Sequence, residues 1–241
     1  MSHIVEALRA QGDRIAVFTE TRQLSYATLA DLVSQSAMTL GTERRLVLLE
    51  ARNALTTLVH YLGALAGGHV ALPVPADGDH GTILRTYSPD TVIDAAGIHH
   101  RRTHSTHRLH DDLALLMSTS GSTGSPKLVR LSYTNLTSNA AAIAEYLAIS
   151  ETDRAATTLP LSYCYGLSVV NSHLLRGAAA LRVKRDTLPF VVEAGEGRAR
   201  VLGTEFEVRR GAGATRVTVL QGRVAVSAGT GAGAAEEVLG A

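Results

Sequence analysis

The chain has 241 residues, a formal net charge of +1 and 45% hydrophobic residues. A chain of this length and hydrophobicity builds a buried core, which excludes disorder throughout. The balanced charge and the low aromatic content, 4% with no tryptophan, offer little to attract phosphates or stack on bases, so we expect no nucleic-acid partner.

The single cysteine, Cys164, excludes an internal disulfide and a cysteine-based zinc site. Residues 1–14 carry charges where a signal peptide needs an apolar core. The most apolar region, residues 45–75, is interrupted by polar side chains such as Glu50 and His60, so it is no membrane span. We therefore expect a cytoplasmic protein.

The first elements alternate between helix and strand. Apolar residues near the 3.6-residue period predict a helix over 24–40, with Ser25 as its cap, and another over 53–66, ended by Gly67 and Gly68. Short apolar runs at 45–50 and 69–75 predict buried strands. This alternation predicts an α/β unit with a parallel sheet.

Residues 76–110 are polar and rich in turn-forming residues, with one expected strand at 91–97. Thr134 is a plausible N-cap for the helix that follows the expected strand at 127–132. The further expected elements are strands at 112–118, 127–132 and 155–160 and helices at 134–148 and 166–177.

After about residue 185 the pattern becomes one of short alternating strands. We expect strands within 190–195, 198–203, 205–210, 215–221 and 223–228. Gln221 and Gly222 suit a tight hairpin turn, residues 211–214 a looser one, and the glycine- and alanine-rich tail at 227–241 is expected to fray. The predicted fold class is α/β, an incomplete N-terminal α/β part followed by a small all-β segment.

The segment STSGSTGSPK at 118–127 has two possible interpretations, a flexible linker and a phosphate-binding loop. Glycine lets backbone N–H groups form an anion nest, hydroxyls add donors and lysine adds a positive charge. The Walker motif does not fit, because Pro126 precedes Lys127 and Leu128 follows it. Apolar strand-like runs on both sides favour the phosphate loop over the linker.

The segment TSGSTGSPK at 119–127 resembles the signature motif of the adenylate-forming (AMP-binding) superfamily, which includes acyl-CoA synthetases, peptide-synthetase adenylation domains and luciferases. The resemblance implies ATP and Mg²⁺ as cofactors, a small-molecule carboxylate as substrate, and contacts to the ATP phosphates. The residues that inherit these contacts are Thr119, Ser120, Gly121, Ser122, Thr123, Gly124 and Lys127.

The resemblance extends over residues 10–183 and includes LPLSYCYG at 159–166, similar to a motif that shapes the acyl pocket. Many members have histidine at the position of Tyr163. The family's adenine-binding loop, magnesium-holding acidic residue, ribose-binding aspartate and catalytic lysine have no counterpart after Val183. We therefore assign no catalytic residue and expect weak or no ligation.

Residues 189–229 resemble part of the FecR-like family of sigma-factor regulators, in VLGTEFEV and VTVLQGRVAV. The resemblance implies a β module that contacts a protein partner. The expected domains are thus a partial AMP-binding domain at 1–185, a partial FecR-like module at 186–229 and a flexible tail at 230–241. A signalling protein and a non-functional gene fusion remain alternatives to a carboxylate-activating enzyme.

A histidine-rich run lies at 99–110, and its spacing suits either a metal on one helical face or an exposed polar connector. Arginines within the run disfavour a cation, so no metal site is assigned. The residues concerned are His99, His100, His104, His107, His110, Asp111 and Asp112. Cys164, between aromatic residues, is expected to be a packed side chain.

Overall fold

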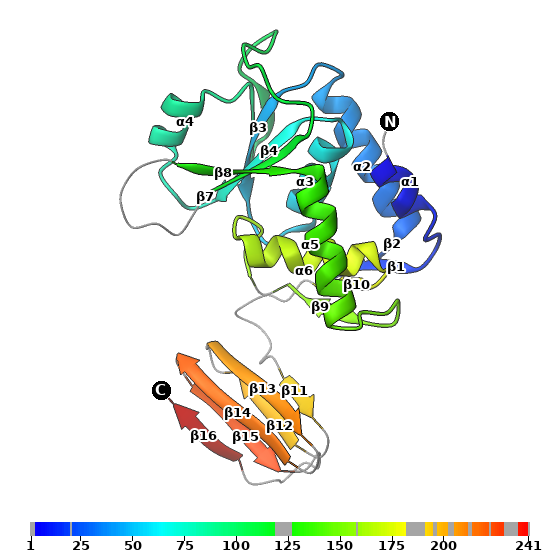
Figure 1. The fold of residues 1–241 in the computed structure, drawn as a ribbon, viewed down its shortest axis with the longest axis vertical. Helices are drawn as coiled ribbons and strands as arrows, with labels where there is room; N and C mark the ends of the chain where they lie inside the picture. Colours follow the sequence, from blue (N-terminus) through cyan, green and yellow to red (C-terminus); the bar gives the residue numbers. More distant parts are fainter. Residues whose placement is uncertain are drawn as a thin grey trace. The chain divides into compact units, whose positions relative to one another are not determined.

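The computed structural model divides into two compact units, Met1–Val183 and Lys184–Ala241 (Figure 1). The structure describes residues 3–19, 21–118, 127–157, 159–181, 191–194, 197–201, 205–211, 214–221, 223–228 and 236–240. The first unit is a mixed α/β fold with two sheets, and strands alone occupy the described part of the second. The fold class predicted from the sequence is confirmed.

The larger sheet has six strands in the order β6-β5-β3-β4-β7-β8. Its four inner strands run parallel, and the edge strands β6 and β8 are antiparallel to their neighbours. The bounds are β3 Leu46–Ala51, β4 Val70–Pro75, β5 Thr91–Asp94, β6 Gly97–His100, β7 Leu113–Ser118 and β8 Leu128–Ser132. The expected parallel sheet is therefore present, whereas β6 was not predicted.

Helices cover both faces of this sheet. Alternate residues of β3 separate onto them, with Val47 and Leu49 in the core beside α3 (Leu55–Ala66) and Leu46 and Leu48 in a second core beside α4 (Gly81–Tyr87). A strand buried on both faces needs apolar residues at nearly every position, which explains the continuous apolar runs in the sequence. The short helix α4 was missed because its seven residues are too few to show a helical period, although Ile83, Leu84 and Tyr87 pack against the second core.

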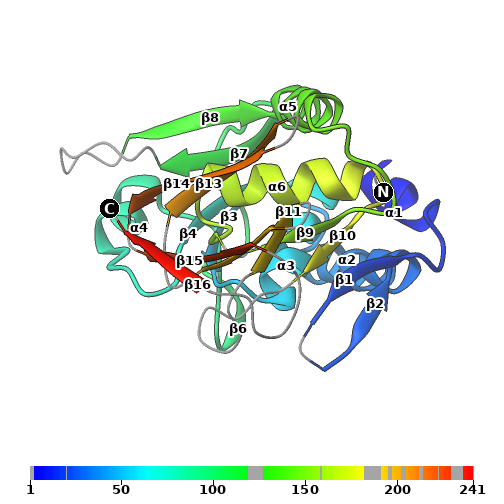
Figure 2. The ribbon, with the colours of Figure 1, turned by 90° about the horizontal axis from the view of Figure 1, so that it is seen from below.

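A second sheet of four strands, in the order β2-β1-β10-β9, joins the two ends of the first unit. Its strands are β1 Ile15–Phe18, β2 Gln23–Ser25, β9 Arg154–Ala156 and β10 Ala179–Leu181. The buried hydroxyl of Tyr26, at the start of α2 (Tyr26–Leu40), donates to the carbonyl of Ala178 at 2.6 Å. This bond fastens α2 to the segment that enters β10. Seen from below in Figure 2, α6 (Cys164–Leu175) runs beside this sheet.

Two helix starts test the predicted caps. Ser25 caps α2 as expected, accepting from the N–H of Thr28. The predicted cap Thr134 is wrong, because α5 (Tyr133–Tyr146) begins one residue earlier and its cap is Ser132. Ser132 and Asn135 form a reciprocal capping box, which satisfies two backbone donors and outcompetes a single threonine. At the far N-terminus, α1 (His3–Arg9) was not predicted.

The second unit contains a four-stranded sheet, β11-β12-β15-β16, and the pair β13-β14. Its strands are β11 Val191–Ala194, β12 Gly197–Val201, β13 Glu205–Gly211, β14 Ala214–Gln221, β15 Arg223–Ala228 and β16 Glu236–Gly240. The five predicted strands are confirmed, and Gly211 pairs with Ala214 where the looser hairpin was expected.

Two expectations for this unit are wrong. No tight hairpin joins the strands flanking Gly222, a residue outside those described, because β14 pairs with β13 while β15 pairs with β12 and β16. The tail does not simply fray, because β16 adds to the edge of β15 through backbone hydrogen bonds that composition does not reveal.

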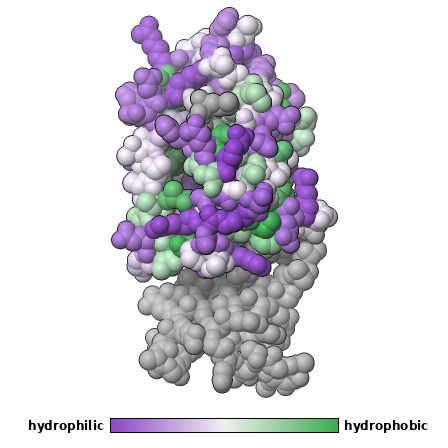
Figure 3. All heavy atoms as spheres, turned by 90° about the vertical axis from the view of Figure 1, so that its right-hand side faces the viewer, coloured by the Kyte–Doolittle hydropathy of each residue, from purple (hydrophilic) through white to green (hydrophobic). Residues whose placement is uncertain are grey.

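The described helices include none that is long and apolar enough to cross a membrane. On the face of the first unit shown in Figure 3, hydrophilic residues predominate and hydrophobic ones form separate small patches. This mixture is ordinary for a protein surface in water.

Candidate functional site

The predicted phosphate loop connects two paired strands. β7 and β8 are antiparallel, and Ser118 at the end of β7 pairs with Leu128 at the start of β8. Both strands were predicted from the flanks of the loop, so those expectations are confirmed. Of the seven predicted phosphate contacts, Thr119, Ser120, Gly121, Ser122, Thr123 and Gly124 lie outside the described residues. Lys127 is described and is exposed at the base of the hairpin.

Arg44 fixes the entry to this hairpin. Its guanidinium donates to the carbonyls of His110 at 2.8 Å and Leu113 at 2.5 Å, and also to the carbonyl of Gly68. These bonds join the end of α3 to the first residue of β7. Sequence reasoning missed Arg44, because nothing in its local pattern distinguishes it from the other arginines.

A groove of ≈ 900 Å³ lies beside the hairpin, lined also by Tyr87 of α4 and by the segment that leads into β7. Its floor is apolar and includes Leu116 and Leu128, and its rim carries more basic than acidic groups. The charged and titratable residues that line it are Tyr87, Arg108, His110, Asp112, Lys127 and Arg130. A rim of this kind attracts an anionic group such as a phosphate, and the lining residues include no nucleophile paired with a base.

The segment expected to shape an acyl pocket leads into α6. Tyr163 and Tyr165 are 50% and 61% exposed, so both rings are available for contact. Between them Cys164 is also exposed, which contradicts the expected packed side chain. Cys164 is the first residue of α6, and some side chains of a helix's first turn point outward. Its aromatic neighbours therefore do not enclose the thiol. Gly166 is required here, because a Cβ atom would lie 2.5 Å from the carbonyl oxygen of Pro160.

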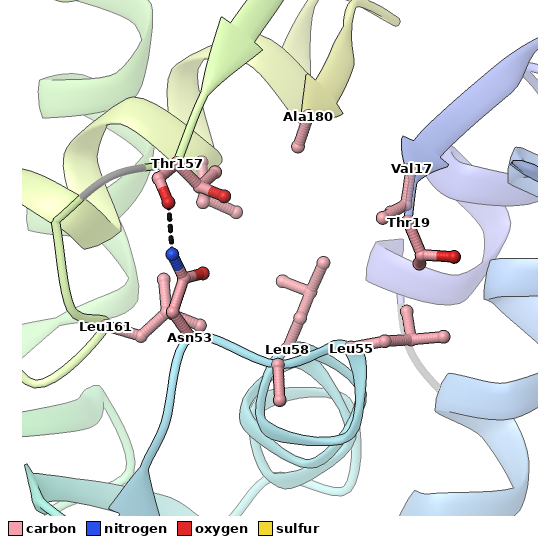
Figure 4. Close-up of a pocket in the computed structure, with 10 residues that line it drawn as sticks. Val17, Thr19, Asn53, Leu55, Leu58, Thr157, Leu161 and Ala180 are labelled. Carbon is pink, nitrogen blue, oxygen red and sulfur yellow. Dashed lines mark hydrogen bonds between the residues drawn. The ribbon is translucent and has the colours of Figure 1, made fainter. Parts of the chain in front are cut away.

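A small cavity lies between β1 and β10 of the four-stranded sheet, the start of α3, and α6 (Figure 4). The side-chain amide of Asn53 donates to the carbonyl of Thr157 across its edge. The cavity volume is ≈ 20 Å³, enough for about one water molecule. It is too small for an organic substrate, so we assign it a structural role.

The histidine-rich run forms β6 and an irregular segment rather than a helix. Its members have separate partners: His99 lies 3.0 Å from Asp94, His100 3.0 Å from Thr91, His104 3.5 Å from Glu43 and His107 3.0 Å from the carbonyl of Ser88. Within the part of the chain that is described, no group of three or more His, Cys, Asp or Glu side chains could hold a metal ion.

Asp90 holds this run against the sheet. Its carboxylate is fully buried and accepts from the N–H of Leu46 at 2.9 Å, the hydroxyl of Ser105 at 2.8 Å and Arg102 at 3.4 Å. A buried carboxylate with several donors is an anchor for the backbone around it. Here it ties residues 101–107 to the first residue of β3, a role that the sequence did not indicate.

Comparison with known proteins finds similarity to AMP-binding enzymes over part of the chain. Residues 82–195 match the family model described as AMP-binding enzyme. Surfactin synthase subunit 2 from Bacillus subtilis (strain 168) is 42% identical over 80 residues, 32% of this chain and 2% of that protein. The family-model match includes the segment 119–127, so the expected resemblance to AMP-binding enzymes is supported on sequence over that region.

Solved structures show the same fold. Apo MatB from Rhodopseudomonas palustris has a TM-score of 0.63 at 20% identity, over 75% of this chain and 44% of that one. The Klebsiella oxytoca NpsA N-terminal subdomain, in complex with 3-hydroxybenzoyl-AMSN, has a TM-score of 0.62 at 21% identity, over 74% and 52%. The Vibrio cholerae adenylation domain AlmE, bound to glycyl-adenosine-5'-phosphate, scores 0.61 at 18% identity, over 76% and 44%. The chain thus spans about half the length of these structures.

Proposed function

We propose that the first unit is the N-terminal part of an ATP-dependent, adenylate-forming enzyme that activates a carboxylate. The observation that carries this proposal is the AMP-binding match over residues 82–195, which includes a serine-, threonine- and glycine-rich segment between two paired strands. A MatB structure contains ATP, and the NpsA and AlmE structures contain an acyl-AMSN ligand and an acyl adenylate.

In this proposal residues 119–127 hold the β- and γ-phosphates of ATP together with Mg²⁺. Backbone N–H groups and hydroxyls of the loop act as neutral donors, and Lys127 adds the positive charge. The contacts assigned to this role are Thr119, Ser120, Gly121, Ser122, Thr123, Gly124 and Lys127. Arg108 and Arg130, on the rim of the neighbouring groove, increase the positive potential at the loop.

The carboxylate substrate is proposed to contact the start of α6. Tyr163 and Tyr165 present exposed rings there, and Gly166 lets the helix approach the chain at Pro160. Tyr163 stands where many family members have histidine, so an imidazole that can carry a positive charge is replaced by a phenol, whose hydroxyl still donates or accepts. We therefore expect the acyl group to be recognised by aromatic contact and hydrogen bonding rather than by charge.

We further infer that residues 1–241 alone catalyse adenylation weakly or not at all. The described part of residues 184–241 consists of strands in sheets separate from the two sheets of the first unit. Positioning and charge stabilisation supply most of the rate in phosphoryl-type chemistry. A loop that binds only the phosphates supplies little positioning and little charge stabilisation when no residues fix the adenine and the ribose.

Two measurements on the purified chain test these proposals. Titration with Mg²⁺-ATP should show binding that Lys127→Ala weakens about tenfold, which corresponds to about 1.4 kcal/mol. The matched control is Lys184→Ala, which removes the only other lysine and should leave affinity unchanged. Equal affinities for the two variants would contradict the phosphate assignment. Carboxylate-dependent exchange of pyrophosphate into ATP should stay at background, and robust exchange would contradict the inferred inactivity.

A second candidate function concerns the β-strands after residue 184. We propose that this module, which resembles FecR-like regulators in sequence, contacts a protein partner by adding a strand to an open sheet edge. In the described part of the module β16 is an edge strand, and its Val238 is 55% exposed. Edge strands with exposed apolar residues are common sites of strand addition.

Substitution of the edge residue tests this second candidate in the full chain. Val238→Lys places a charge on the edge and should abolish concentration-dependent self-association measured by light scattering. Val238→Thr keeps the strand propensity and is the matched control. This candidate is wrong if both variants associate like the unaltered chain. It is also wrong if the unaltered chain is monomeric and captures no FecR-type signalling partner.

A further inference from the structure

The β7–β8 hairpin is attached to the rest of its sheet on one side only. β8 is the edge strand, and among the described residues the register of β7 on β4 joins only Leu115 to Ala71. By contrast, β3 and β4 are in register over the whole of Leu46–Ala51. A segment with few partners moves more readily than a central strand. The direction of the hairpin therefore depends on the contacts that hold its base.

Arg44 holds the entry to the hairpin. One terminal nitrogen of its guanidinium donates to the carbonyl of Gly68, just after α3, and the other donates to carbonyls around the start of β7. Those carbonyls belong to His110 at 2.8 Å, Asp111 at 3.2 Å and Leu113 at 2.5 Å. Gly68 has a φ of +76°, so the turn that presents its carbonyl requires glycine. Because the guanidinium is planar with its donors in a fixed fork, it fixes the two backbone segments relative to each other.

Tyr133 holds the exit from the hairpin at the same end of α3. It follows β8 directly, and its hydroxyl donates to the carbonyl of Leu65 at 3.0 Å, in the last turn of α3. Its backbone N–H donates to the carbonyl of Asp112 at 3.1 Å, across the base of the hairpin. Burial raises the pKa of the Tyr133 phenol more than the neighbouring Arg44 lowers it, so the hydroxyl is a donor near neutral pH. Arg44 and Tyr133 therefore clamp both legs of the hairpin to the C-terminal end of α3.

This clamp lies at the end of the hairpin opposite to the phosphate loop. Leu113 pairs with Ser132 at the clamp, and Ser118 pairs with Leu128 beside the loop. At about 3.3 Å per residue, the length of β7 separates the two ends by roughly 17 Å. Arg44 is therefore too far from the loop to contact phosphates that the loop holds. It can act on them only through the direction of the hairpin.

We propose that Arg44 is a positioning residue for the phosphate loop: it clamps the base of the β7–β8 hairpin and so sets where Lys127 and the loop meet the phosphates of ATP. This inference rests on the proposed ATP-binding function. The scaffold itself has other support, because α3 and β4 are held in the two cores by side chains such as Leu58 and Leu72. Arg44 instead bonds to backbone carbonyls of the connecting segments. Its loss should therefore redirect the hairpin and leave the cores intact.

Titration of the full chain with Mg²⁺-ATP tests the effect on the loop. Arg44→Ala should weaken the affinity about tenfold, because the loop is misplaced. Arg44→Lys should weaken it about fivefold, because an ammonium keeps the charge but does not span both segments. The matched control is Arg176→Ala, which removes an exposed charge at the end of α6 and should leave the affinity unchanged. In a Lys127→Ala background, Arg44→Ala should weaken the affinity less than about twofold, because the contact that it positions is already lost. Equal losses in both backgrounds would overturn the proposal.

A distance measurement tests the hairpin itself, whether or not ATP binds. Spin labels on the exposed Cys164 of α6 and on a Val129→Cys substitution in β8 report the direction of the hairpin relative to α6. The distance distribution should be narrow in this labelled chain and broader or shifted when Arg44→Ala is added. Tyr133→Phe, which removes only the hydroxyl, should produce a smaller change of the same kind and serves if Arg44→Ala is unstable. An unchanged distribution would overturn the proposal. A changed distribution without ATP binding in any variant would support the clamp and contradict the ATP site, so the two failures are distinguishable.

Discussion

Strands β4 and β8 belong to one sheet, with β7 between them, and have opposite environments. Every residue of β4 from Val70 to Val74 is buried, whereas Val129 of β8 is 43% exposed and Arg130 is exposed. The centre of the sheet is therefore the scaffold, and its edge presents Lys127 and the groove to solvent. The difference implies that changes in β4 act on stability and changes beside β8 act on binding.

The largest loss in the free energy of unfolding is expected in the central strand β4. Leu72→Ala removes a fully buried side chain that packs in the core beside α4, and should lower the free energy of unfolding by about 2–5 kcal/mol. Val129→Ala in β8 should cost less than about 0.5 kcal/mol. Urea denaturation followed by circular dichroism measures both. Similar losses for the two variants would remove the contrast between centre and edge.

A smaller loss in the free energy of unfolding is expected where Asp90 ties the irregular segment 101–107 to β3. Asp90→Ala leaves the N–H of Leu46 and the hydroxyl of Ser105 without their acceptor, and should cost about 2 kcal/mol. Asp112→Ala, an exposed carboxylate near the edge, is the matched control. Hydrogen exchange should also become faster at residues 101–107 in the Asp90 variant alone. Unchanged exchange there would mean that other contacts hold this segment.

The sequence predicted the centre of the fold better than its margins, for a physical reason. Continuous apolar runs such as 45–50 and 69–75 have one stable environment, a strand buried on both faces, so their structure follows from composition. The short strand β10 depends on β1, a partner far away in the chain that local patterns do not contain. The late strand β16 pairs with the preceding strand β15, but its glycine- and alanine-rich surroundings are typical of a flexible tail. The helix cap at Ser132 is different, because its reciprocal partner Asn135 lies only three residues on, and the sequence reading overlooked this local pattern.

The candidate sites divide in the same manner. The phosphate loop was predicted because its chemistry lies in consecutive residues, and the family match covers it. Arg44 and Asp90 could not be predicted, because their partners come together only through the order of the strands. Chemistry assembled across a sheet edge needs the topology as well as the sequence.

The stability of the first unit should also fall at alkaline pH, through the buried Tyr61 of α3. Burial raises the pKa of Tyr61 to about 12, and its hydroxyl accepts from the amide of Asn171 at 3.1 Å. The folded pKa exceeds the value of about 10 expected on unfolding, so this contribution to stability is full below pH 10 and is lost as pH rises toward 12. Tyr61→Phe should cost about 1 kcal/mol at pH 7 and flatten the stability profile above pH 10. A profile unchanged by the substitution would assign the alkaline loss to other groups.

The smallest change in stability is expected at the site proposed for function. Lys127→Ala should alter the free energy of unfolding by less than about 0.5 kcal/mol, because the side chain is exposed. The same variant should lose about tenfold in Mg²⁺-ATP affinity, so one residue separates the two properties. Parallel urea denaturation and ATP titration measure them on the same sample. A loss of stability that accompanies the loss of affinity would mean that Lys127 packs as part of the scaffold, and β8 would then resemble β4 more than its exposure suggests.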